Sequence, residues 1–456
     1  MNRKRKTGRR LQLESLEERR MLAVIVVDDD FAADDAAAGH FTTIQAAVNA
    51  ATAGDKIKVR AGTYEENVVV NKQLTIKGAD AKLKNYLDPT KASIVDPVNN
   101  STAGSAAIAF DLQADGIKIE GFTIGEFDSN TDADGTIGIR TAATHAGYTI
   151  EDNVIEKNTI GVYLNSSTST TTTPARTKVE DNLIRDNNRT GANSGNGIFS
   201  DLGLQNAKIE DNDFTGANSS TGIRIVGSGG GTTGLPATVQ SGITIEDNDF
   251  ANLSGGGVYF EKVVDSKIDD NDLTNIALSG IQLNGGNQRV TISHNDVRQA
   301  GTQNVFGIIL SDRGGLGGNQ NNVIRKNHIV DSGSSGLVIR DSSSNTIEKN
   351  KISGSTSSSA QTATTGNGIS LENADNNTLT DNKLRDNDRN GIFVDANSSG
   401  NTLTKNNSKN NNAGNLSAFD YTDLSTGGTG TASTQNTYAK NKGRTQNVTG
   451  LIAKFI

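Results

Sequence analysis

The stretches KIEDNDF (208–214), TIEDNDF (244–250) and TIEKNKI (346–352) each place an asparagine directly after a short alternating segment. The same asparagine returns eleven times, as Asn153, Asn182, Asn212, Asn248, Asn271, Asn295, Asn327, Asn350, Asn382, Asn406 and Asn441. Successive members are 23 to 36 residues apart. A period in that range predicts a solenoid, in which each repeat covers the apolar face of its neighbour.

Each repeat reads as three short strands. The first follows a glycine, as in GIRI (222–225), GVYF (257–260), GIQL (280–283) and GIFV (391–394). A second strand such as ITIE (243–246) leads to the asparagine, and two residues later one apolar residue points inward, such as Phe214, Phe250, Leu273 or Val297. Alternation with a period of two over such short segments predicts β structure and not helix.

The recurring asparagine has a physical explanation that needs no ligand. Asparagine tolerates the left-handed backbone conformation that a sharp turn between strands demands. Its side-chain amide can also hydrogen-bond to the same amide in the coils above and below. We therefore expect a structural asparagine ladder.

This pattern resembles the right-handed parallel β-helix of the pectate-lyase-like class, with PbH1-type repeats as in NosD-like and many carbohydrate-active proteins. The resemblance covers roughly residues 40–445. It implies an all-β, single-stranded right-handed parallel β-helix of about twelve coils, which at ~4.8 Å between strands would make a rod ~60 Å long.

The two ends of the repeat differ from its middle. TTIQAAVNAATAG (42–54) predicts an amphipathic helix with a threonine N-cap, an apolar stripe of Ile44, Ala47 and Val48, and Gly54 at its end. Such a helix would plug the open end of the core. The stretch that follows (55–78) resembles the opening of pectin methylesterases. We expect an export segment at 1–23, the cap and first coils at 24–110, repeats at 111–415, and an irregular last coil with a C-terminal cap at 416–456.

The basic N-terminal segment points to export. LQLESLEERRMLA (11–23) resembles an N-terminal motif of secreted proteins from planctomycete-type bacteria. The alternative is a basic tail with no role in export. We expect a protein that is secreted or held in the cell envelope, extracellular or periplasmic.

Composition excludes several classes of function. The chain has no cysteine and four scattered histidines (His40, His145, His294 and His328), which excludes disulfide frameworks and Cys/His metal sites. The net charge of −8 disfavours nucleic acid and anionic membranes as partners. No stretch is long enough to span a bilayer, and we expect a monomer.

The catalytic motifs of the enzymes that share this fold are missing. The chain lacks the QDT and arginine elements of pectin methylesterases, the polygalacturonase aspartate set and the DPH element of mannuronate epimerases. The clusters EDND (210–213 and 246–249) and DDND (269–272) lie on the repeated turn, which is a poor match to a paired-aspartate site. The catalytic residues are therefore not assigned.

The outward face of the glycine-led strands is the candidate binding surface. Alternation places Arg140, Tyr163, Phe199, Arg224, Tyr259 and Gln282 outward on successive coils, with Asn165, Asp201, Glu261 and Asn284 one step on. The substrate-binding candidates are Arg140, Tyr163, Asp201, Arg224, Tyr259 and Glu261, because arginine pairs with carboxylates, rings stack on sugars and carboxylates bind hydroxyls. The alternative is a merely solvated sheet face, which the absence of tryptophan favours.

An acidic strip precedes the ladder in the first coils. Its members are Glu120, Glu151, Glu180, Glu210, Glu246 and Asp269, followed by Asp152, Asp181, Asp211, Asp247 and Asp270. Stacked like charges are unfavourable, and Lys118, Lys178, Lys208 and Lys267 supply part of the compensation. Ca²⁺, which takes oxygen ligands, is one candidate for the rest; water, salt and turn hydrogen bonds are the alternative.

Three functions remain open on the sequence. The first is a secreted protein that binds extracellular polysaccharide through the N-terminal half of the glycine-led face. The second is a polysaccharide lyase or hydrolase of unrecognised family that uses the same face, with Arg140 or Arg224 as base or clamp and Asp201 and Glu261 as carboxylate partners. The third is a structural or adhesive envelope protein.

Overall fold

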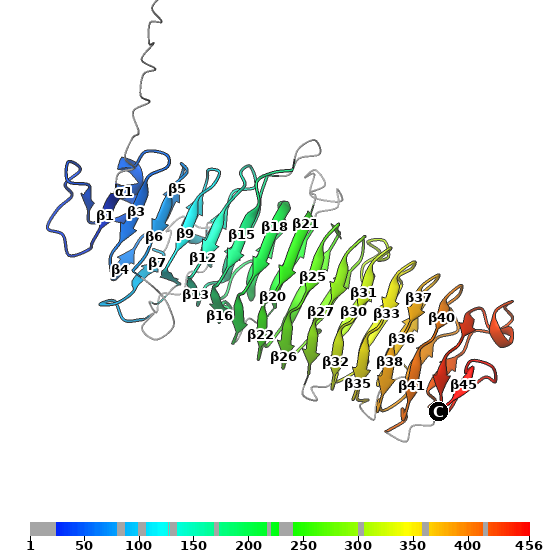
Figure 1. The fold of residues 1–456 in the computed structure, drawn as a ribbon. Helices are drawn as coiled ribbons and strands as arrows, with labels where there is room; N and C mark the ends of the chain where they lie inside the picture. The colour runs from blue at the N-terminus through cyan, green and yellow to red at the C-terminus, as the bar shows by residue number, and fades with distance from the viewer. Residues whose placement is uncertain are drawn as a thin grey trace, which may run out of the picture.

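The chain winds into a long rod of stacked parallel strands (Figure 1). A computed structural model describes residues 24–79, 87–98, 106–125, 127, 135–167, 173–216, 220–227, 240–299, 305–357, 364–413 and 418–456. Three parallel sheets, here called A, B and C, run along the rod. The structure confirms the expected right-handed parallel β-helix.

Sheet C carries the glycine-led strands and has 13 members in the described part of the chain. They are β5 (Val68–Val70), β8 (Ala107–Leu112), β11 (Thr136–Thr141), β14 (Ile160–Tyr163), β17 (Asn196–Ser200), β20 (Thr221–Val226), β23 (Gly256–Glu261), β27 (Ile281–Asn284), β30 (Ile308–Ser311), β33 (Leu337–Arg340), β36 (Ile369–Glu372), β39 (Ile392–Val394) and β42 (Tyr421–Asp423).

Sheet A contains the strands that lead into the asparagine. They are β1 (Val24–Val27), β2 (His40–Phe41), β3 (Lys56–Val59), β6 (Thr75–Lys77), β9 (Lys118–Glu120), β12 (Thr149–Glu151), β15 (Thr177–Glu180), β18 (Leu204–Glu210), β21 (Gln240–Glu246), β24 (Val263–Val264), β25 (Lys267–Asp269), β28 (Thr291–Ser293), β31 (Val323–Arg325), β34 (Thr346–Glu348), β37 (Thr378–Thr380), β40 (Thr402–Thr404) and β43 (Thr437–Ala439).

Sheet B begins directly after the asparagine in each repeat. Its strands are β4 (Gly62–Glu65), β7 (Ser93–Asp96), β10 (Phe122–Ile124), β13 (Val154–Glu156), β16 (Leu183–Arg185), β19 (Asp213–Thr215), β22 (Asp249–Ala251), β26 (Asp272–Thr274), β29 (Asp296–Arg298), β32 (His328–Val330), β35 (Lys351–Ser353), β38 (Lys383–Arg385), β41 (Asn407–Lys409), β44 (Lys442–Gly443) and β45 (Lys454–Phe455). The asparagines therefore lie at the corner between sheets A and B.

The core is the interior of the rod. The apolar residue that follows the ladder by two positions is buried in each of the predicted cases, with Phe214, Phe250, Leu273 and Val297 at 1% exposure or less. The rings of Phe214 and Phe250 stack with centroids 4.7 Å apart. One continuous cluster of buried side chains runs from Ile25 to Ile452, so each coil stabilises the next.

The predicted asparagine ladder is confirmed. In every rung from Asn153 to Asn441 the side-chain Nδ2 donates to Oδ1 of the ladder asparagine in the next coil, at 2.9–3.2 Å. The same Oδ1 also accepts the backbone N–H of the preceding asparagine, as between Asn212 and Asn248 at 3.1 Å. These bonds satisfy polar groups that the corner would otherwise bury unpaired.

The expected left-handed conformation of the asparagine is wrong. It belongs to the residue before it in all eleven coils: Asp152, Asp181, Asp211, Asp247, Asp270, His294, Lys326, Lys349, Asp381, Lys405 and Lys440, with φ between 53° and 58°. The φ of the asparagine lies outside the left-handed region, and its neighbour makes the turn. The turn and the ladder hydrogen bonds are therefore made by two adjacent residues, whereas the sequence predicted that the asparagine makes both.

A second asparagine ladder was missed in the sequence. Asn322, Asn345, Asn377, Asn401 and Asn436 lie five positions before the first ladder, and their amides bond from coil to coil at 2.9–3.2 Å. The signal was present, because NTIEKN (345–350) and NTLTKN (401–406) each contain both asparagines. The C-terminal half of the rod thus has two ladders, one on each side of sheet A.

The glycines that lead the sheet C strands also form a column. A Cβ added at Gly138, Gly161, Gly197, Gly222, Gly257, Gly280, Gly307, Gly336 or Gly368 would lie within 3.0 Å of the carbonyl oxygen of the next glycine in the column. Their φ angles are outside the left-handed region. Glycine is therefore required here by the close approach of successive coils.

The rod is closed at both ends. Helix α1 (Ile44–Ala50) packs its predicted stripe on the first coil, with Ile44, Ala47 and Val48 fully buried. Thr43 Oγ1 accepts from the Ala46 N–H at 3.2 Å. The helix ends at Ala50 and not at Gly54, because the backbone is already extended at the C-cap residue Ala51.

At the other end, Leu451 and Ile452 are buried, β45 pairs with β44, and the short 3₁₀ turn η1 (Thr431–Ser433) lies just before β43. The expected export segment at 1–23 lies outside the described residues. Among the residues that are described, none of the helices has the length and apolar character to cross a membrane.

Candidate functional site

The predicted outward column of sheet C is in register. Backbone pairing places Asp111, Arg140, Tyr163, Phe199, Arg224, Tyr259 and Gln282 on consecutive strands from β8 to β27. Side chains opposite each other on neighbouring strands lie ~5 Å apart. The column is therefore a continuous strip of six coil-to-coil contacts on one face.

Arg140 is fixed by a carboxylate that the sequence reading missed. Its Nε and terminal nitrogen donate to the two oxygens of Asp111 at 2.9 and 2.6 Å, and Gln113 Nε2 also donates to Asp111 at 2.6 Å. The hydrogen bonds to Asp111 raise the pKa of Arg140 above its ordinary value. Arg140 is thus a permanently charged, oriented group and cannot serve as a general base.

Tyr163 connects the arginine to the next coil. Its ring stacks on Phe199 with centroids 5.6 Å apart, and its hydroxyl donates to Asp201 Oδ1 at 2.6 Å. Burial, and then the hydrogen bond to Asp201, raise the pKa of Tyr163, so the hydroxyl stays protonated. A hollow of about 370 Å³ adjoins this group, lined by Arg140, Tyr163 and Asn165 together with Thr141–His145.

Arg224 lies between two aromatic rings. Its guanidinium carbon is 6.0 Å from the centre of Phe199 and 5.2 Å from the centre of Tyr259. Nε of Arg224 is buried and makes no hydrogen bond. A second hollow, of about 220 Å³, is lined by Arg224, Tyr259 and Gln282 with Leu278 at its rim. The guanidinium is held by stacking between the two rings.

Tyr259 and Glu261 form a pair like that of Tyr163 and Asp201. The Tyr259 hydroxyl donates to Glu261 Oε2 at 2.8 Å, and Asn284 Nδ2 donates to the same oxygen at 3.1 Å. Burial, and then the hydrogen bond to Glu261, raise the pKa of Tyr259. Each aromatic–arginine group thus ends in a carboxylate that accepts a tyrosine hydroxyl.

The six candidates form two groups on one face. Arg140, Tyr163 and Asp201 make the first, and Arg224, Tyr259 and Glu261 make the second. Phe199 joins them by stacking on one side and by the cation–π contact on the other. A small apolar cluster of Ile137, Ile160 and Phe199 supports them outside the main core, a feature that the sequence reading did not identify.

The same column changes character toward the C-terminus. Ile309, Val338, Ser370 and Phe393 continue it, and all four are at 3% exposure or less. Buried side chains offer no surface to a ligand. The open part of the face therefore coincides with the N-terminal half, as the sequence reading expected.

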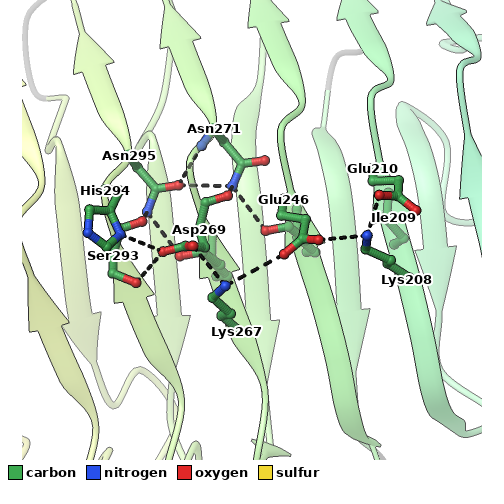
Figure 2. A network of polar contacts seen from close by, with 12 residues as sticks. Lys208, Ile209, Glu210, Glu246, Lys267, Asp269, Asn271, Ser293, His294 and Asn295 are labelled. Carbon is green, nitrogen blue, oxygen red and sulfur yellow. Dashed lines mark hydrogen bonds and ion pairs between the residues drawn. The ribbon is translucent and has the colours of Figure 1, made fainter.

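The acidic strip is compensated more fully than its sequence suggested. Lys208 Nζ lies between Glu210, which it contacts closely, and Glu246 at 2.7 Å, and Lys267 bridges Glu246 and Asp269 at 3.6 and 2.8 Å (Figure 2). Hydrogen bonds to Glu210 and then Glu246 raise the pKa of Lys208 to about 12. Lysines and carboxylates thus alternate along sheet A.

The first and last carboxylates of the strip have further partners. Glu120 receives Lys118 at 2.5 Å and Lys77 at 2.9 Å. Burial opposes ionisation of Glu120, but the hydrogen bonds from these two lysines outweigh it and lower its pKa to about 2. At the other end Asp269 accepts from Ser293, and His294 Nδ1 lies 2.9 Å from it.

This arrangement does not fit a calcium site. In the described part of the chain, the one group of three carboxylates whose oxygens gather closely enough for a metal ion is Asp28, Asp29 and Asp30 at the N-terminal cap, where Asp28 is already paired with Arg60 at 2.6 Å. Among the strip carboxylates, Glu210, Glu246 and Asp269 are paired with lysine instead, while burial, and then the charge of Asp270, raise the pKa of Asp247. Lysine ammonium groups supply positive charge for which the sequence analysis named Ca²⁺ as a candidate.

A second acidic column lies on the other side of the ladder. Asp213, Asp249, Asp272 and Asp296 are direct neighbours on β19, β22, β26 and β29. Burial, and then the charges of Asp296 and Asp249, raise the pKa of Asp272. The sequence reading counted this column among the turn residues and gave it no role.

Asp272→Asn should stabilise the protein at neutral pH by about 0.5 kcal/mol, because it removes a charge stacked between like charges. A raised folded-state pKa means that the folded protein binds this proton more tightly than the unfolded chain. The unfavourable contribution is therefore full above the raised pKa and is lost as the pH falls through it toward the ordinary value of 3.8. Urea denaturation at several pH values should show the advantage of the variant shrinking with acid.

Asp269→Asn, in the lysine-paired acidic strip, is the control for which we expect the opposite sign of stability change. Burial opposes its ionisation, but hydrogen bonds from Lys267, Ser293 and His294 outweigh this and lower the pKa of Asp269. This substitution should destabilise the protein at neutral pH, and the loss of stability relative to the wild type should shrink as the pH falls. The same sign of change for both variants would contradict the distinction between the two acidic columns.

Three family models match parts of this chain. A family model described as a right-handed β-helix region matches residues 311–441, and one described as the periplasmic copper-binding protein NosD matches residues 176–367. A model described as planctomycete extracellular matches residues 7–26. No curated protein matches the chain significantly.

Solved structures share the fold at low identity. The A-module of a mannuronan C-5 epimerase from Azotobacter vinelandii is 12% identical, over 94% of this chain and 97% of that one, with a TM-score of 0.41. DFA-IIIase from Arthrobacter chlorophenolicus A6 is 16% identical, over 78% and 84%, with a TM-score of 0.47. The Agl-KA catalytic domain is 14% identical, over 85% and 65%, with a TM-score of 0.50.

Copper does not fit the residues present in the matched region. Protein copper sites use histidine, cysteine or methionine ligands. Residues 176–367 contain two histidines and neither of the other two residue types. His294 and His328 lie on different coils beside Asp269 and Asp296, and in the described residues they belong to no metal-like cluster.

The fold, the repeats and the N-terminal motif agree with one another. Stacked parallel sheets and asparagine ladders run through the region that the two β-helix models match. The planctomycete extracellular motif places the protein outside the cytoplasm, in the periplasm or the extracellular space. The chain is a right-handed parallel β-helix protein whose repeats are similar to those of the right-handed β-helix and NosD family models, with an N-terminal motif of the planctomycete extracellular type.

Proposed function

We propose that this protein binds an extracellular polysaccharide along the open part of sheet C. The observation that carries the proposal is the continuous stack of Tyr163, Phe199, Arg224 and Tyr259 across four coils, with a hollow beside each end. The half-buried rings of Tyr163 and Tyr259 and the guanidinium plane of Arg224 offer flat surfaces to sugar rings, and the buried ring of Phe199 holds Tyr163 and Arg224 in place. The polar tips of the same column offer donors and acceptors to hydroxyls and carboxylates.

The stack is ordered before any ligand arrives. Asp111 holds Arg140 at two points, and Phe199 and Tyr259 flank Arg224. Side chains that are already fixed lose little conformational entropy on binding. A strip of several coils also suits a chain-like ligand, which can contact both hollows at once.

Binding is better supported than hydrolysis. Glycosidases use two carboxyl groups about 5–9.5 Å apart around one bond. Asp201 follows β17 and Glu261 ends β23, and these strands are separated by β20, so their backbones lie ~10 Å apart. Each carboxylate is also engaged by a tyrosine hydroxyl. The names of the mannuronan and alginate epimerases concern polysaccharides, but likeness at such identities shows the fold alone.

The double substitution Arg224→Ala/Tyr259→Ala should weaken retention on the cognate polysaccharide about tenfold or more, because it removes the stacked cation and the ring beside it. Affinity electrophoresis through gels that contain polygalacturonate, alginate, xylan or dextran would measure the effect. The free energy of unfolding, measured by thermal denaturation, should change by no more than about 2 kcal/mol, since both side chains are outside the main core.

Arg298→Ala is the matched control, because it removes an exposed arginine from sheet B. Retention should be unchanged in that variant. Unchanged retention of the double variant would contradict the assignment of the sheet C face. Mass spectrometry of soluble products from the same polysaccharides would test the alternative, since released oligosaccharides would make the protein an enzyme.

A further inference from the structure

The A–B corner of the last coils carries a concentration of lysines. A shallow hollow of about 560 Å³ is lined by Lys349, Lys351, Lys383, Lys405, Lys440 and Lys442, with Asp381 and Asn407. We call this the lysine hollow. The corner lies between sheets A and B, so the lysine hollow is separate from the sheet C face and faces solvent on its own side of the rod.

The lysines of the hollow stand next to one another without compensation. Lys351 and Lys383 are paired residues on β35 and β38, and Asn407 connects them to Lys442 on β44. Adjacent strands are ~4.8 Å apart, where like charges repel. All six ammonium groups are exposed, and within the described ranges none has an ion pair. Asp381 is the one carboxylate that lines the hollow.

The same corner is organised differently in the first coils. There the residue before the ladder is Asp152, Asp181, Asp211, Asp247 or Asp270, and a sheet A lysine pairs with nearby carboxylates. The protein has a net charge of −8, yet its corner reverses sign along the rod. A basic patch on an acidic protein is a local feature that average composition does not explain.

Three lysines of the hollow occupy a backbone conformation that other residue types prefer. Lys349, Lys405 and Lys440 occupy the left-handed corner position with φ of 56°, 57° and 55°. Aspartate and asparagine adopt this conformation more readily than lysine does, and aspartate fills it in the first five coils. Lys157 and Lys262 have the same conformation elsewhere in the chain, so such turns tolerate lysine, and in the last coils lysine at this position places a positive charge at the corner.

We infer that the lysine hollow binds a linear anionic polysaccharide, through its carboxylate or sulfate groups, along the axis of the rod. The cations repeat coil by coil, which matches a polymer that repeats its anionic group sugar by sugar. Lysine is a mobile point charge and accepts either anion without strict geometry. The protein lies outside the cytoplasm, where such polymers occur.

A second copy of the chain fits this surface less well. Its acidic columns have the complementary charge, but they also surround a hollow, of about 370 Å³, lined by Asp213, Asp249 and Asp272. Two hollowed corners placed against each other would leave a gap between them. A narrow, flexible polymer can instead enter the hollow and contact lysines on both of its sides.

The test is a charge-matched pair of variants. Lys351→Gln/Lys383→Gln removes two neighbouring cations of the hollow, and Lys58→Gln/Lys91→Gln removes two exposed cations near the N-terminal cap. Binding to polygalacturonate, dextran sulfate and neutral dextran would be measured at low and high salt. The wild type should bind one or both anionic polymers, with affinity that falls as salt is added, and should ignore neutral dextran.

The first variant should weaken anionic binding about fivefold or more, and the second should leave it unchanged. Equal losses in both variants, or none in either, would overturn the inference. A wild type that dimerises by sedimentation, with only the hollow variant monomeric and polymer binding intact, would replace it with self-association. Arg224→Ala/Tyr259→Ala should retain this salt-sensitive binding, so failure of the sheet C proposal can be told apart from failure of this one.

Discussion

Gly257→Ala should lower the free energy of unfolding by about 3 kcal/mol, because the added methyl group has no room between two coils. An added Cβ would lie 2.5 Å from Leu273 Cδ2 and closer still to the carbonyl oxygen of Gly280. That carbonyl accepts the N–H of Val258 at 3.0 Å. Relief of the clash therefore requires the two coils to separate at a bond that holds them together.

Gly256→Ala is the control in the adjacent position. Its added Cβ would meet Ser279 O at 3.5 Å, an ordinary contact, and its φ lies outside the left-handed region. The change in stability should be within about 0.5 kcal/mol. Chemical denaturation followed by circular dichroism measures both variants, and equal losses would mean that the glycine column has no packing role.

Asn248→Ala should cost about 3–5 kcal/mol, because a fully buried hub of hydrogen bonds is lost. Its Oδ1 accepts from the N–H and Nδ2 of Asn212 at 3.1 and 3.0 Å. Its Nδ2 donates to Asn271 Oδ1, Ile209 O and Glu246 O at 3.0, 2.9 and 2.8 Å. The substitution leaves the buried N–H of Asn212 without a partner, and unpaired buried groups are costly.

Asn397→Ala removes an exposed asparagine from the C-terminal half and should change stability by less than about 0.5 kcal/mol. Polysaccharide binding should survive in both variants, because Asn248 faces the A–B corner and not the sheet C face. If Asn248→Ala is as stable as the control, the ladder does not contribute to the cohesion of the rod.

The sequence was sufficient for the fold because the fold repeats. Eleven similar environments make one asparagine visible in spite of variable loops, and period-two alternation identifies the inward residues. It could not decide which of two adjacent residues makes the turn at Asp247 and Asn248, since both types tolerate φ > 0. The lysines at the same position show that the surrounding coils, and not local preference, impose the turn.

The candidate site was predicted less completely, for reasons of geometry. Alternation along one strand gives the outward direction of Arg140 and Arg224, and parallel pairing then aligns them. Asp111 was missed because β8 has no leading glycine and so does not match the repeat. The hydrogen bonds of Tyr163 to Asp201 and of Tyr259 to Glu261 depend on side-chain rotamers, about which spacing carries no information.

The closed ends of the rod have a consequence for its solubility. A parallel stack that simply stopped would expose a full row of unpaired backbone N–H and C=O groups, onto which another molecule could add its own first coil. Helix α1 at one end, and Leu451, Ile452 and β45 at the other, occupy those positions. They cover the terminal coils, where another molecule could otherwise add a strand.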